Sequence, residues 1–297
     1  MDRPKKRQKP NPSTKEPNAE HMGTLRPNDH YLISSDTRNP LKLNIFLRAH
    51  EQDPATKVFD FHHCLYPLMF TIHQNFISLL KDHLLGRILK HDYDGDNAPF
   101  SLEERSKLSF RNNTIYQHKV IRINHTTYDM RREQDSLNPS RQANIMVLAP
   151  DSEDHPYWYA RIIGIFHAIV SHPDLPEPTQ MDLLWVRWYG LDPDLRYRFG
   201  WKARRLPRIG FVEDTDDPNG SPPFGFIDPA SIIRGVHLIP AFKDHRTSDL
   251  LDTSALARLP EEGDYDWNFF YVNMYVLSIL FFTYLSLMLN SVSLTVT

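Results

Sequence analysis

Two neighbouring stretches indicate the type of fold, PYWYARIIGIF at residues 156–166 and MDLLWVRWYG at residues 181–190. Both alternate their side chains with a period of two, which is the pattern of β-strands whose two faces have different surroundings. In the first stretch, strict alternation places Trp158, Ala160, Ile162, Gly164 and Phe166 on one face. In the second, it sets Leu184, Val186 and Trp188 against Leu183, Trp185, Arg187 and Tyr189. The two stretches therefore predict two strands of one small sheet.

Other strand-like runs lie on both sides of this pair. They are NTIYQHKVIRINHTTYDM at 113–130, ANIMVLAP at 143–150, RIGFVED at 208–214 and PFGFIDPASIIRGVHLIPAF at 223–242. Polar and Pro-rich turns separate them, and the chain has 23 prolines against 11 glycines. Several short strands with turn signals between them are typical of a small, strongly curved barrel or sandwich.

Helices are expected only before the strands. Apolar residues at helical spacing predict a helix from about Gln74 to Leu89. A second, short helix is predicted after Ser101, because Glu104 follows three residues later, as a capping box requires. The fold class expected from these patterns is α+β, with a small β-barrel preceded by a short helical region.

The two ends of the chain have unusual compositions. Residues 1–35 begin with a Pro- and Lys-rich tail that is predicted to be disordered, and its basic run resembles a nuclear-import signal. Phe269 to Leu289 is almost wholly apolar, which meets the length rule for one membrane-spanning helix. The expected organisation is a basic tail (1–35), a helical region (36–109), a barrel domain (110–245), a linker (246–266) and an apolar helical segment (267–297).

The overall charge excludes a strong global attraction to nucleic acid. The formal net charge of the 297 residues is −3, so nucleic-acid binding requires a local basic patch. The single cysteine, Cys64, excludes an internal disulfide and fits a reducing compartment. No nucleophile motif, phosphate-binding glycine loop or metal-ligand pattern is present, so no catalytic residue, metal or cofactor is predicted and the chain is not expected to be an enzyme.

Two groups of residues are candidate binding sites. The first is an aromatic pocket formed by Trp158, Tyr159, Trp185 and Tyr189, which either holds a cationic group or fills the core of the barrel. The second is the basic stretch LRYRFGWKARRLPRIG at 195–210, which either contacts nucleic acid or pairs with the acidic turn at 213–217. Its candidate contact residues are Arg196, Arg198, Lys202, Arg204, Arg205, Arg208 and Trp201.

Several stretches resemble the C-terminal region of Plavaka-type transposon proteins of mushroom-forming fungi. They include LKDHLLGRIL, HPYWYARIIGIFHA, MDLLWVRWYG, FGFIDPASIIRGVHLIPAF and DWNFFYVNMYV. The resemblance covers about residues 35–276 and implies a fragment of a transposon-encoded protein without the DNA-cutting core. After YVNMYV the family continues with charged residues, whereas this chain becomes apolar, which fits translated intron sequence as well as a membrane helix.

The segment IMVLAP…YWYARIIGIFHA…DLLWVRWYG is also similar to bromo-adjacent-homology and related SH3-like modules. This second resemblance implies a small barrel that binds histone tails, nucleosomes or partner proteins without catalysis. Together, the two resemblances predict a nuclear, non-catalytic module that contacts DNA or histone tails. A docking module for another transposon-encoded protein and a tail-anchored membrane protein are the alternatives.

Overall fold

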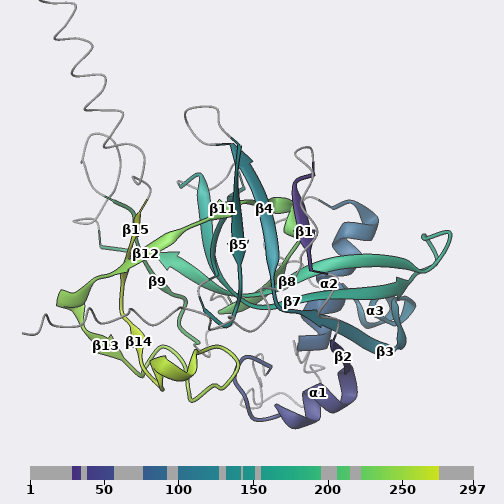
Figure 1. Cartoon of the computed structure of the whole chain (residues 1–297). Coiled ribbons are helices and arrows are strands. Elements are labelled where there is room, and N and C mark those ends of the chain that lie inside the picture. Colours follow the sequence, from purple (N-terminus) through teal and green to yellow (C-terminus); the bar gives the residue numbers. More distant parts are fainter. Residues whose placement is uncertain are drawn as a thin grey trace, which may run out of the picture.

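The computed structural model describes residues 29–34, 39–56, 76–91, 100–126, 132–141, 143–150, 155–194, 206–214 and 222–273. These residues form mainly antiparallel β-structure: one sheet of ten strands, one of three and one of two. The short helices gather at one end of the molecule (Figure 1). The strands in the middle of the chain and the helices before them agree with the sequence pattern, whereas the expected α+β class is corrected to mainly antiparallel β.

A long hairpin of β7 (Tyr157–Ser171) and β8 (Thr179–Leu191) organises the large sheet. The two strands pair with each other along one edge, and each pairs with two further strands along its other edge. On β7, the first half pairs with β6 (Asn144–Leu148) and the second half with β3 (Ser109–His118). On β8, the part nearer the hairpin tip pairs with β10 (Phe224–Ile227) and the last residues pair with β9 (Arg208–Phe211). Strand β2 (Asn39–Lys42) extends the sheet beyond β3.

The sheet curls strongly but remains open. Strands β11 (Ile232–Gly235) and β12 (His237–Pro240) are separated only by Val236, yet they pair with β6 and with β15 (Phe270–Asn273), at opposite ends of the path β11-β6-β7-β8-β9-β15-β12. Because β11 and β12 do not pair with each other, no ladder closes the sheet. The prediction of a closed SH3-like or bromo-adjacent-homology-like barrel is therefore wrong. The half of the hairpin nearer its tip supports an additional, helix-covered part of the sheet instead.

A bulge in β7 changes which residues share a face. Ile162 pairs with Val186 and Gly164 with Trp185, so Ile163 is an extra residue in the ladder. Beyond this point the alternation is reversed. Phe166 packs with Trp185 rather than with Ile162, in contrast to the strict alternation predicted from the sequence. Gly164 makes this possible, because a Cβ at this position would collide with the Phe166 ring.

Three helices cover one face of the outer half of the hairpin. They are α1 (Leu43–Ala49), α2 (Phe76–Leu89) and α3 (Leu102–Lys107). The Phe76 ring of α2 meets Trp185 and Phe226 edge-on, at centroid distances of 5.0 and 5.2 Å. Helix α2 confirms the predicted helix over its described residues, and the capping box of Ser101 and Glu104 is also confirmed. A buried ion pair joins α2 to α3, with Arg105 Nε donating to Asp82 Oδ1 at 2.7 Å.

The opposite face of the hairpin carries a separate small sheet. It consists of β1 (Tyr31–Ile33), β4 (Ile121–Thr126) and β5 (Arg132–Leu137), in the order β1-β4-β5. Ile121 and Ile123 of β4 are fully buried against Ile162, Ile165 and other apolar residues of the hairpin. The small sheet covers the hairpin only in part, and this position creates the pocket described below.

The C-terminal part of the fold differs from the expected apolar helix. Trp267 belongs to the short strand β14 (Asp266–Trp267), which pairs with β13 (Arg246–Thr247), and the following residues form β15. The start of the apolar segment is therefore extended, while residues 274–297 lie outside the described part. Within the described ranges, no helix is long and apolar enough to cross a membrane. Residues 246–266, expected to be a linker, contribute the buried residues Leu251 and Arg258. They also contain the short 3-10 helix η5 (Pro260–Glu262). Two further 3-10 helices, η3 (Pro229–Ser231) and η4 (Phe242–Asp244), precede this segment in the chain.

Candidate functional site

On the face opposite the helices, the half of the hairpin nearer its tip has one pair of polar residues that lie directly across from each other. His167 of β7 lies directly across from Asp182 of β8, and β3 places Tyr116 beside His167 on the other side. Side chains opposite each other in antiparallel strands share a face and lie close together. Three strands thus bring their polar side chains together where strand β1 of the small sheet passes over them.

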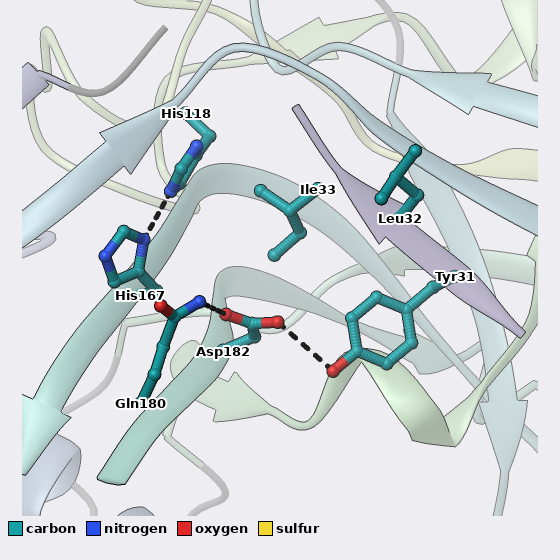
Figure 2. A pocket seen from close by; sticks show the side chains of 7 residues that line it. All are labelled: Tyr31, Leu32, Ile33, His118, His167, Gln180 and Asp182. Atoms are coloured by element: carbon teal, nitrogen blue, oxygen red, sulfur yellow. Dashed lines mark hydrogen bonds between the residues drawn. The ribbon is translucent and has the colours of Figure 1, made fainter. Parts of the chain in front are cut away.

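A pocket of about 330 Å³ lies at this crossing. Figure 2 shows its polar and apolar sides. Its lining residues come from β1, β3, β7 and β8: Tyr31, Leu32, Ile33, His118, His167, Gln180 and Asp182. This volume lies at the small end of the range for ligand pockets, and suits one side chain or a small group.

Two hydrogen-bonded histidines form one wall of the pocket. Nδ1 of His118 lies 2.6 Å from the main-chain oxygen of Ser34, and Nε2 of His118 lies 2.7 Å from Nδ1 of His167. A carbonyl oxygen can only accept, so Nδ1 of His118 carries a proton. In the neutral pair, Nε2 of His118 then accepts from Nδ1–H of His167. The Tyr116 ring stacks on His167 at 4.6 Å, so the orientations of both imidazoles are fixed.

Asp182 provides the negative charge of the pocket. Its carboxylate accepts hydrogen bonds from Tyr31 Oη at 3.3 Å and from Gln180 Nε2 at 3.1 Å. Burial raises the pKa of the Tyr31 phenol to about 12, with the charges of Asp182 and Asp228 acting in the same direction. Tyr31 is therefore a neutral donor near pH 7, and neither hydrogen-bond donor neutralises the carboxylate.

The arginine beside the pocket is used elsewhere. Nη1 of Arg87 donates to the main-chain oxygen of Asp182 at 2.5 Å, and its Nη2 lies 2.7 Å from Oδ2 of Asp228. Among the residues that the structure describes, no cationic side chain forms an ion pair with the Asp182 carboxylate. In the same described residues, no group of three or more His, Cys, Asp or Glu side chains is placed to hold a metal ion. The arrangement is therefore suited to receiving a cationic group.

The predicted aromatic pocket is not assembled. Trp185 is buried in the helix-side core, and Trp158 packs edge-on against Trp188 in the core beneath the small sheet, at 5.8 Å. Tyr159 and Tyr189 lie across from each other and are buried in a third core with Phe211, on which Tyr189 stacks at 4.3 Å. Four rings that lie in three separate cores cannot surround one ligand.

One of the seven predicted nucleic-acid-binding residues lies in the described part of the chain. Arg196, Arg198, Trp201, Lys202, Arg204 and Arg205 lie outside the described residues. Arg208 is described and is buried in β9, where Nε lies 2.8 Å from Asp192 Oδ2 and Nη2 lies 3.4 Å from Asp244 Oδ1. Its guanidinium also stacks over Phe269 at 3.9 Å. These contacts make Arg208 part of the interior.

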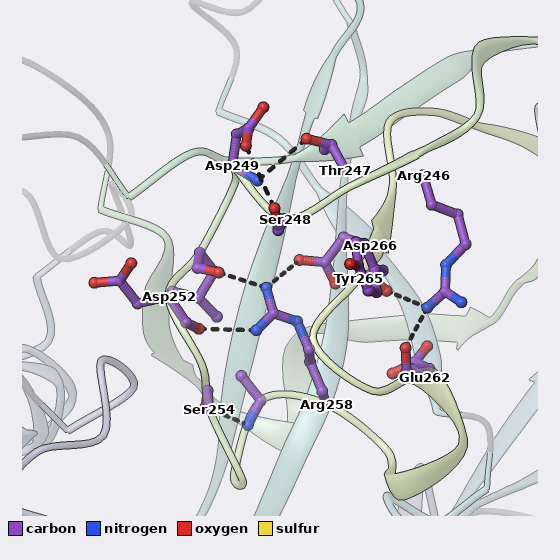
Figure 3. A network of polar contacts seen from close by, with 12 residues as sticks. Arg246, Thr247, Ser248, Asp249, Asp252, Ser254, Arg258, Glu262, Tyr265 and Asp266 are labelled. Atoms are coloured by element: carbon purple, nitrogen blue, oxygen red, sulfur yellow. Dashed lines mark hydrogen bonds and ion pairs between the residues drawn. The ribbon is translucent and has the colours of Figure 1, made fainter.

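Buried ion pairs explain why arginines alternate with aromatic residues in the hairpin. Arg187 is fully buried, bonds both oxygens of Asp266 at 3.0 and 2.8 Å, and lies 3.8 Å over the Phe211 ring. Arg258 donates to the same carboxylate at 2.9 Å and to two main-chain oxygens of residues 251 and 252 (Figure 3). Arg161, across from Arg187, pairs with Glu262 at 2.8 Å. The arginines therefore stabilise the fold and do not belong to the pocket.

Sequence reasoning missed the residues of the pocket, although β8 contained a signal. Asp182 and Gln180 occupy the same alternating face as Leu184 and Val186, so a charged residue stands where the pattern demands an apolar one. No pattern in the sequence indicated that Tyr31, His118 and His167 line the pocket. These residues are far apart in the sequence, and only the strand registers bring them together.

Comparison with known proteins gives no match: no protein-family model, no curated protein and no solved structure is similar to the chain. The resemblances to Plavaka-type proteins and to bromo-adjacent-homology modules therefore stay predictions.

Proposed function

We propose that the chain is a non-catalytic binding module whose pocket receives a cationic side chain from a basic segment of a partner protein. The observation that carries this proposal is the carboxylate of Asp182, which accepts hydrogen bonds from neutral donors in the pocket and forms no ion pair with a described residue, since Arg87 bonds its main-chain oxygen and pairs with Asp228. A partly buried carboxylate gains more from an incoming cation than an exposed one, because the surroundings screen the attraction less.

The same charge favours a basic protein segment over DNA as the ligand of this pocket. An anionic phosphate would be repelled by Asp182, whereas a lysine or arginine side chain would be attracted. Basic, lysine-rich protein segments of the histone-tail type fit this requirement, and so does a basic segment of another transposon-encoded protein. The resemblance to chromatin modules agrees with such a ligand and with a nuclear location, both of which belong to the proposal.

Replacing Asp182 with asparagine is expected to weaken binding of a lysine-rich peptide of histone-tail composition by roughly 10- to 150-fold. This range corresponds to the loss of one hydrogen bond to a charged group, about 1.5–3 kcal/mol. Fluorescence anisotropy with the full chain measures the effect, and Asp249→Asn, an exposed carboxylate beside β13, is the matched control. The same peptide with acetylated lysines should bind the unmodified chain as weakly as the parent peptide binds the variant. Equal binding by the acetylated peptide would contradict the proposal.

DNA contact by the basic stretch is a separate proposal, supported only by its composition. If residues 196–205 contact phosphates, then replacing Arg204 and Arg205 with alanine should reduce the slope of log Kd against log salt by roughly 2. Arg141→Ala, at an exposed turn after β5, should leave the slope unchanged. An unchanged slope in both variants, or no DNA binding by the full chain, would remove this proposal without affecting the pocket.

A further inference from the structure

Strand β1 has a free edge. Within the described part of the chain it is the end strand of the small sheet, and only its β4 side is paired. Exposed strand edges are usually protected by charged residues, prolines or bulges, because unpaired main-chain groups can accept another strand. The three residues of β1, Tyr31, Leu32 and Ile33, include no such protection.

The register shows which residues point toward this free edge. Asn124 N donates to His30 O at 2.9 Å, and Ser34 N donates to Val120 O at 3.1 Å. In an antiparallel ladder the residues that bond to the neighbour alternate with residues that bond away from it. Residues 30, 32 and 34 therefore face β4, whereas the main-chain N–H and C=O groups of Tyr31 and Ile33 point away from it. Among the residues that the structure describes, those four groups have no hydrogen-bond partner.

The free edge and the charged pocket coincide. Tyr31 and Ile33 line the pocket that contains Asp182, and Figure 2 shows β1 running beside it. We infer that the basic segment binds in an extended conformation as an added strand on β1, with one cationic side chain directed to Asp182. Two edge residues at positions i and i+2 match the spacing of alternate residues in an extended peptide, and such strand addition is a recurring mode of peptide recognition.

This inference rests on the proposed function and specifies the form of its ligand. It commits to a segment of a partner protein, because the charge of Asp182 requires a basic occupant and the main-chain groups require an extended one. Strand addition would also make the site selective for extended basic segments. A folded basic surface or a free amine could reach Asp182, but only an extended chain can satisfy the donors and acceptors of Tyr31 and Ile33 as well.

Amide hydrogen exchange of the full chain, measured by NMR with and without saturating lysine-rich peptide, tests the inference. The amides of Tyr31 and Ile33 should exchange at least tenfold more slowly with peptide bound. The Leu32 amide, which faces β4, is the internal control and should change much less. A peptide series methylated at one main-chain nitrogen at a time should show weakened binding at alternate positions only, because only every second N–H of an added strand faces β1.

The possible results separate the two proposals. Asp182-dependent binding without new protection at Tyr31 and Ile33, or with no alternating effect of methylation, would overturn strand addition and leave the proposed function in place. Protection of both amides in the chain alone would show that another part of the same chain occupies the edge, which also overturns the inference. Absence of any peptide binding would overturn both.

Discussion

Replacing Asp266 with asparagine is expected to lower the free energy of unfolding by roughly 3–5 kcal/mol, the usual cost of removing one partner from a buried ion pair. Asp266 is 3% exposed and is shared by Arg187 and Arg258, which are 0% and 6% exposed. The variant leaves two buried guanidinium groups facing a neutral amide that can no longer balance their charge. Chemical denaturation monitored by tryptophan fluorescence measures the loss.

Asp252 provides a matched control for this variant. Its main-chain oxygen accepts from Nη1 of Arg258 at 2.8 Å, but its own side chain is exposed. Asp252→Asn makes the same chemical change beside the same network and should alter stability by less than about 0.5 kcal/mol. Similar stabilities for the Asp266 and Asp252 variants would contradict the assignment of Asp266 as the centre of the network.

The Asp266 network should also make stability depend on acid pH. Burial alone would raise the pKa of Asp266, but its hydrogen bonds and charge interactions with Arg187 and Arg258 outweigh burial and lower it. A carboxyl group with a lowered folded-state pKa contributes stability above its unfolded pKa, about 3.9, and loses that contribution as pH falls through the folded pKa. The stability difference between the native chain and Asp266→Asn should therefore be constant near neutral pH and narrow in acid.

Replacing Gly164 with alanine is expected to destabilise the protein by about 1–3 kcal/mol, because an added methyl group overpacks a filled core. The new Cβ would collide with the ring of Phe166, which is 1% exposed and packed beneath α2. Relief of the collision requires either a shift of the ring or a change in the bulge that aligns the two halves of β7. Thermal denaturation followed by circular dichroism measures the effect.

The same substitution at Gly86 should have the opposite sign. Gly86 lies inside α2, and a Cβ there would have no heavy atom within 4 Å. Alanine is favoured over glycine in a helix by about 1 kcal/mol, so Gly86→Ala should raise stability by up to that amount. If both alanine variants lowered stability equally, the close contact at Gly164 would not be the cause.

The local elements of this fold could be predicted from sequence because each depends on neighbouring residues. The alternation in 156–166 and 181–190 indicated two strands, the spacing of leucines indicated α2, and the pair of Ser101 and Glu104 indicated a helix start. The predicted closed barrel failed because closure depends on which strands pair at the two ends of the sheet. The continuous segment 232–240 reaches both ends without closing them, and no local pattern encodes that arrangement.

The roles of particular side chains depended on facts that local sequence does not contain. One extra residue at Ile163 reversed the faces of β7. The acid that neutralises Arg187 lies 79 positions later in the sequence, so the hairpin alone left a cation-binding pocket and a filled core as alternatives and gave no sign of the internal ion pair. The pocket likewise combines residues separated by up to 151 positions, as in the contact between Tyr31 and Asp182. Only the strand registers bring these groups together.

A double-mutant cycle between Asp182 and the peptide measures whether a cationic side chain meets this carboxylate. Asp182→Asn in the protein is combined with replacement of one lysine at a time by norleucine, which keeps the chain length but removes the charge. A direct contact predicts that one lysine shows a coupling energy of about 1–3 kcal/mol with Asp182, the range found for interacting groups. Effects that add within about 0.5 kcal/mol at every lysine would show that no cationic side chain of the peptide meets Asp182 in the pocket.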